Sequence, residues 1–127
     1  MKETWVTPMR NGLYSVHILM TDGVRGRDSG VLLLRDGVLI GGGPYFWSVG
    51  EYTVTGQTWK GGLRTNQHTP FADPASRPLF GGREASSGFT GTFSGDHAEV
   101  YGTTLVGGKY SYGFRATLRW LAALDGK

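Results

Sequence analysis

The side chains of this chain that could do metal or acid–base chemistry are widely spaced. The three histidines are His17, His68 and His97, and no two of them have the short spacing of a metal-binding motif. The chain has no cysteine, which excludes disulfides, thiolate zinc sites and a cysteine nucleophile. We therefore expect no metal ion and no cofactor, and we interpret the histidines as ordinary strand residues.

Two carboxylates and a serine pair are the other candidates for catalysis. Glu51 and Glu99 occupy similar places in the segments GEYTVTG and HAEVYG, and could in principle form a general acid–base pair. Charged residues that alternate along strands usually meet water instead. The segment Ser86-Ser87-Gly88 lacks the strand-to-helix turn that a serine nucleophile needs. We expect the protein not to be an enzyme.

A glycine-rich segment, Gly41 to Gly43, could cradle a phosphate, bend a sheet or present aromatic rings to a partner. A phosphate loop leads into a helix whose amides face the anion, but here Pro44, three aromatic residues and another strand follow. Phosphate binding is thus excluded. Glycines at a strand end let a sheet coil or bulge, so we predict a structural corner.

Three consecutive aromatic residues follow this corner. Successive side chains of an extended chain point to opposite faces, so at least one ring of Tyr45, Phe46 and Trp47 should face away from the core. An outward ring either anchors an interface or covers a neighbouring strand. Together with Trp59, these residues are the predicted contacts to a partner or ligand.

The elements that position these residues are predicted to be strands. The composition combines 22 glycines with six tyrosines, six phenylalanines and four tryptophans, which is typical of strands joined by tight turns. Apolar residues alternate in GLYSVHILM and in KYSYGFRATLRW, and Asp36-Gly37, Gly95-Asp96 and Gly107-Gly108 mark turns. The predicted interior residues are Tyr14, Val16, Ile18, Met20, Tyr110, Tyr112, Phe114, Leu118 and Trp120.

This pattern predicts an all-β protein, a single domain over residues 1–127. About eight antiparallel strands should close into an up-and-down barrel, because closure removes exposed strand edges. A proline- and glycine-rich connection at 69–86 interrupts the pattern. Within it, Phe71, Leu79 and Phe80 could plug one end of the barrel or belong to a moving lid.

The charge pattern bears on partners and location. The net charge is +3, and both signs alternate along the chain. Lys60 with Arg64, and Arg115 with Arg119, form short basic stripes that we interpret as solvated surface, so no direct nucleic-acid binding is expected. No apolar run reaches membrane-spanning length and the N-terminus has no signal-peptide segment, so we expect a soluble cytoplasmic protein without membrane contact.

The first half of the chain resembles a known family. The runs NGLYSVHI, SGVLLLRDGVLIGGG and GEYTVTG are similar, in this order, to the small bacterial GrlR-type negative regulators of type III secretion genes. The resemblance implies a lipocalin-like (calycin) barrel that forms a homodimer. It also implies a function by protein–protein binding, the sequestration of a transcriptional activator.

One departure from the family limits what is carried over. The family's best-known regulator has a short exposed acidic motif in the hairpin that here reads VTGQTWK, from Val54 to Lys60, and this chain has no acidic residue there. No functional residue is therefore carried over from that motif. The alternative function is binding of a small apolar ligand, because the interior of an eight-stranded barrel is either filled by side chains or holds one small molecule.

Overall fold

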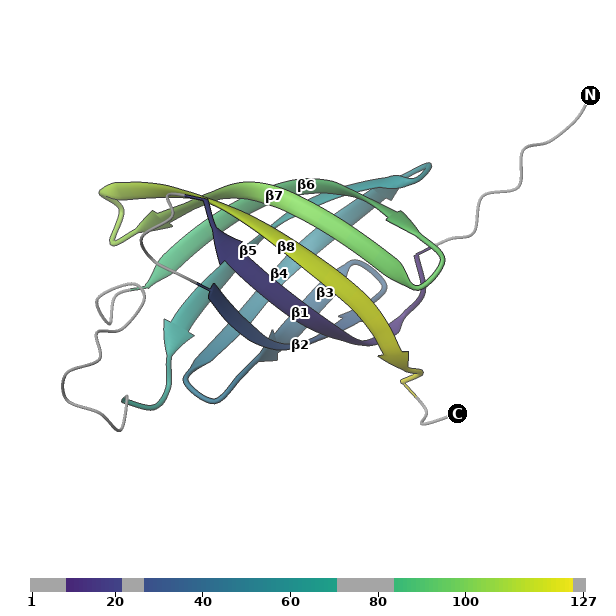
Figure 1. Ribbon diagram of the computed structural model, residues 1–127, viewed down its shortest axis with the longest axis horizontal. Coiled ribbons are helices and arrows are strands. Elements are labelled where there is room, and N and C mark those ends of the chain that lie inside the picture. Colours follow the sequence, from purple (N-terminus) through teal and green to yellow (C-terminus); the bar gives the residue numbers. More distant parts are fainter. Residues whose placement is uncertain (1–8, 22–26, 71–83, 125–127) are drawn as a thin grey trace, which may run out of the picture.

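The computed structural model describes residues 9–21, 27–70 and 84–124, and its strands form one closed antiparallel barrel (Figure 1). Each strand pairs with the next along the chain, and β8 pairs with β1 to close the barrel. The strands are β1 (Gly12–Met20), β2 (Arg27–Arg35), β3 (Val38–Gly42), β4 (Phe46–Thr55), β5 (Thr58–Gln67), β6 (Ala85–Ser94), β7 (His97–Val106) and β8 (Tyr110–Ala122). The predicted all-β, lipocalin-like up-and-down barrel is confirmed. Among the described residues, none form a helix that could cross a bilayer.

The two ends of the barrel differ. At the turn end, β2–β3, β4–β5 and β6–β7 are joined by tight turns, and Asp36 and Gly37 both have the positive φ that a two-residue hairpin turn requires. Here the phenol of Tyr14 donates to the carbonyl oxygen of Arg10 at 2.7 Å, and the Arg10 guanidinium lies 3.6 Å from the ring centre of Trp120. The opposite end, where β4 begins and β5 ends, is called the loop end below.

Most predicted interior residues face the core, because side chains alternate between the two faces of a strand. Tyr14, Val16, Met20, Phe114 and Leu118 are buried. The half-buried residues Ile18, Tyr112 and Trp120 pack against the same core.

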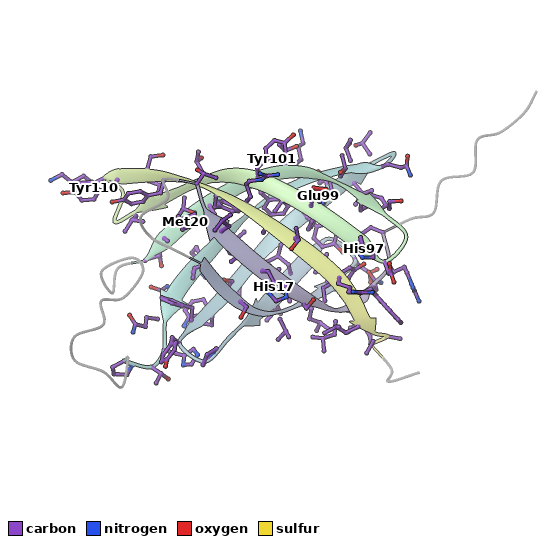
Figure 2. The ribbon with its side chains drawn as sticks, viewed as in Figure 1. His17, Met20, His97, Glu99, Tyr101 and Tyr110 are labelled. Carbon is purple, nitrogen blue, oxygen red and sulfur yellow. The ribbon has the colours of Figure 1, made fainter. Side chains whose placement is uncertain are left out.

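The prediction that Tyr110 lies inside the barrel is wrong. Its side chain is 44% exposed and lies 5.5 Å from the Lys109 ammonium. Tyr110 is the first residue of β8, and Figure 2 shows it at one extremity of the molecule. The alternation does continue to Tyr110, but the strand there has passed the end of the core.

The connection between β5 and β6 is slightly displaced from the predicted interval 69–86. β5 ends at Gln67 and Ala85 begins β6, so the connection covers residues 68–84. The predicted plug or lid residues Phe71, Leu79 and Phe80 lie outside the described residues.

Inward-facing glycines explain why the composition is so rich in this residue. A Cβ atom at Gly41, Gly50, Gly61, Gly91 or Gly102 would collide with a carbonyl oxygen of a neighbouring strand. The strands therefore approach one another at these points more closely than any side chain would allow, which lets a small barrel coil tightly. The same collision, at Gly41 with Val31 and at Gly42 with Phe46, gives the Gly41–Gly43 corner its structural role.

This close approach predicts a large difference between two glycines of β6. Gly91→Ala should lower the free energy of unfolding by about 1 to 3 kcal/mol, because the new methyl group meets the Glu99 carbonyl oxygen. Gly88→Ala should change it by about 0.5 kcal/mol or less, because no atom lies within 4 Å of the new methyl group. Urea denaturation of both variants measures the difference, and equal losses would contradict the prediction.

Candidate functional site

The residues with catalytic potential are not brought together. His17 lies in the middle of β1 and His97 begins β7, where its Nδ1 atom is 2.7 Å from Asp96 Oδ1 (Figure 2). Glu51 and Glu99 are both exposed, on β4 and β7, which are not neighbours in the barrel. Within the described part of the chain, no group of three histidine or acidic side chains could hold a metal ion.

His68 has a structural position next to the glycine corner. One of its ring nitrogens lies 2.9 Å from the carbonyl oxygen of Gly43 and the other 2.6 Å from Thr69 Oγ1. The amide of His68 donates to the carbonyl oxygen of Tyr45 at 2.7 Å. These contacts tie the end of β5 to the corner between β3 and β4.

The barrel interior contains a cavity of about 110 Å³. It extends from Trp59, near the turn end, to Gly43 and Phe46 at the loop end. Most of its wall is apolar, and its lining residues include Val16, Met20, Leu63, Phe89, Val100 and Phe114. At the loop end, part of the cavity wall is formed by Gly30, Gly42 and Gly43, which have no side chains.

Two pairs of hydroxyl groups interrupt the apolar wall. Ser48 and Thr65 face each other across β4 and β5 at 2.7 Å, and Ser87 and Thr104 do so across β6 and β7 at 2.8 Å. In each pair one hydroxyl donates to the other, so each pair keeps one O–H that can still donate. The loop-end half of the cavity therefore offers hydrogen bonds without any charge.

Trp59 closes the cavity toward the turn end. Its side chain is only 2% exposed, and its ring lies edge-on between Tyr52 and Phe89, with ring centres 5.8 Å and 4.8 Å away. Its indole Nε1 has no hydrogen-bond partner among the described residues. Within that part of the chain, it is the one buried side-chain nitrogen or oxygen atom without such a partner.

The four aromatic residues predicted to contact a partner do not share one surface. Phe46 and Trp59 are buried and line the cavity, whereas Trp47 is half-buried on the outer face, with the Arg64 guanidinium 6.0 Å from its ring centre. Tyr45, just before β4, is also half-buried. Phe46 pairs with Gln67 and Trp59 with Val54, so the two lie at opposite ends of the β4–β5 hairpin. The prediction of a cluster at one hairpin edge is wrong, because strand parity turns both rings inward.

An apolar patch that the sequence interpretation missed lies on the outside of β1–β4. Leu13, Leu33, Ile40 and Val49 are paired in register across the four strands and form one row. Val31, Val38 and Trp47 flank this row. Val31, Val38 and Ile40 are 40%, 46% and 51% exposed. We call these seven residues the outer apolar face.

The outside of β5–β8 is different. Its outward positions carry mostly threonine, serine and charged residues, including Lys60, Arg64, Glu99, Arg115 and Arg119, with Tyr101, Leu105 and Leu121 as exposed apolar exceptions. The exterior is thus more apolar over β1–β4 and more polar over β5–β8. The continuous apolar runs VLLL in β2 and VLI in β3 could have indicated this outer patch in the sequence. Strands that are covered on both faces lose the usual alternation of apolar and polar residues.

No family model matches this chain, and no curated protein matches it with significance.

Proposed function

We propose that this protein is a non-enzymatic regulatory protein that acts by binding another protein through its outer apolar face. The observation that carries the proposal is the outer apolar face itself, in which three exposed and four half-buried apolar side chains lie on four adjacent strands, opposite a more polar half of the same barrel. Contiguous apolar surface of this kind marks interaction sites on soluble proteins. Trp47 supplies the kind of ring that often dominates binding energy.

The resemblance to GrlR-type regulators supplies two partners for this face. One is a second copy of the chain, and the other is a transcriptional activator of type III secretion genes that the protein would sequester in the bacterial cytoplasm. The edge of the face carries both signs of charge, since Arg35 and Glu51 flank Val38 on either side. A two-fold pairing could place these opposite charges together, which favours a homodimer. The hairpin at Val54–Lys60 has no acidic residue to contribute to activator binding.

The proposal predicts a dimer that a single charge disrupts. Sedimentation velocity at micromolar concentration should show a dimer. Ile40→Arg should weaken it by about 2 kcal/mol or more, which is roughly 30-fold in the dissociation constant, because it buries an unpaired charge at the centre of the row. Trp47→Ala should weaken it in the same direction. A strictly monomeric parent protein would refute this assignment of the face.

A matched control separates the face from a general charge effect. Thr92→Arg places the same side chain on the exposed outside of β6, opposite Glu99. It should leave both the dimer and the thermal transition unchanged. Co-purification with the activator, tested with the same two variants, extends the measurement to the second partner: loss with Ile40→Arg alone supports the proposal, and equal retention contradicts it.

A second candidate function is uptake of a small molecule by the lumen. The unpartnered indole of Trp59 favours it, and the next subsection develops it.

A further inference from the structure

Trp59 lines the inner end of the cavity, and its indole N–H is a buried donor without a partner among the described residues. Leaving such a donor without a partner destabilises the folded protein, because the group loses its hydrogen bond to water without gaining another. The edge-on contacts with Tyr52 and Phe89 hold the ring in place, so it cannot easily turn to find another acceptor. A molecule bound in the cavity beside the ring could bring the missing hydrogen-bond acceptor.

The chemistry of the wall restricts that acceptor. An indole N–H only donates, so the incoming group must carry a lone pair. None of the described residues that line the cavity is charged, and a buried charge without a partner is very costly. Burial also raises the pKa of the neighbouring Tyr52 phenol, which agrees with the cost of placing an anion at this end. The acceptor is therefore a neutral oxygen, such as that of a ketone or ester.

The volume restricts the shape. The cavity, about 110 Å³, is smaller than the roughly 150 Å³ cavity that holds a benzene molecule. It is elongated from Trp59 to the loop end, and the glycines at that end leave room for a chain to pass. A slender alkyl chain fits this space better than a ring system.

We infer that the barrel lumen binds a slender, uncharged and mainly apolar molecule whose carbonyl oxygen accepts a hydrogen bond from Trp59 Nε1. The apolar chain of the ligand lies along Leu63, Phe89 and Phe114. The hydroxyl pairs Ser48–Thr65 and Ser87–Thr104 can each donate to a further polar group near the loop end. This site lies inside the barrel and shares only Val31 with the outer apolar face, so its test does not depend on the proposed dimer.

Three probes of matched shape test the inference. Methyl ethyl ketone carries the carbonyl, its alkene isostere has a methylene group in place of the oxygen, and propanoate carries a charge. The readout is the indole N–H signal of Trp59 in a nitrogen-15 correlation spectrum, assigned from its loss in Trp59→Phe. We expect the ketone to bind saturably, to shift this signal, and to bind at least about fivefold more tightly than the alkene or propanoate.

The variant Trp59→Phe keeps an aromatic ring and removes the donor. In it the ketone should lose its advantage over the alkene, while both still bind, as measured by calorimetry. If this variant does not fold, the parent spectrum alone decides. An indole signal that stays unchanged up to the solubility limit of the ketone would mean that water satisfies the donor, and it would overturn the inference. Equal affinity of the parent protein for ketone and alkene would overturn it as well.

Discussion

Replacing Trp59 with alanine should lower the free energy of unfolding by about 3 to 5 kcal/mol. The ring is almost completely buried and belongs to the central cluster of the barrel, where it contacts Tyr52 and Phe89. Its removal would both expose this cluster and enlarge the existing cavity next to it. Urea denaturation followed by circular dichroism measures the loss.

Two other tryptophan positions provide controls for this prediction. Trp47→Ala removes the same side chain from the half-buried outside of β4 and should leave the thermal transition nearly unchanged. Trp120 is half-buried at the turn end, so Trp120→Ala should cost less than Trp59→Ala. Trp59→Phe should cost less than half as much as Trp59→Ala, because it also removes an unpartnered donor. A loss near zero for Trp59→Ala would contradict the assigned core.

The fold was largely predictable because its signals are local. The alternation from Tyr14 to Met20 places β1, and the positive φ of Asp36 and Gly37 is what an Asp-Gly hairpin turn favours. Each strand pairs with its sequence neighbour, so the topology needed no long-range information apart from closure. Tyr110 shows the limit of this reasoning, since alternation gives the direction of a side chain but not whether the core extends that far.

The sites were harder to predict because they depend on register. Three consecutive aromatic residues do not reveal which parity faces inward, and only the pairing of β4 with its neighbours turns Phe46 in and Trp47 out. The row from Leu13 to Val49 likewise exists only once four strands are aligned. The missing partner of Trp59 depends on what surrounds one atom, which no sequence pattern specifies.

Tyr14 should make the barrel sensitive to alkaline pH. Burial, reinforced by the nearby Tyr52, raises the pKa of the Tyr14 phenol from its ordinary value of 10.0 to about 12. Above pH 10 the unfolded chain therefore loses this proton before the folded protein does, and stability falls as the pH rises from 10 to 12. The slope from this group approaches about 1.4 kcal/mol per pH unit, and the total loss is about 2 to 3 kcal/mol. Below pH 10 the contribution is fully present.

The variant Tyr14→Phe tests this assignment. It should be less stable at neutral pH by about 1 kcal/mol, because the hydrogen bond from the phenol to the Arg10 carbonyl oxygen is lost. The free energy of unfolding of the variant should nevertheless fall less steeply between pH 10 and 12 than that of the parent protein. The difference in stability between the two should therefore shrink as the pH rises. Some slope should remain, because burial also raises the pKa of Tyr52. Parallel curves for the parent and the variant would show that Tyr14 ionises as an exposed tyrosine does, and would contradict its place in the core.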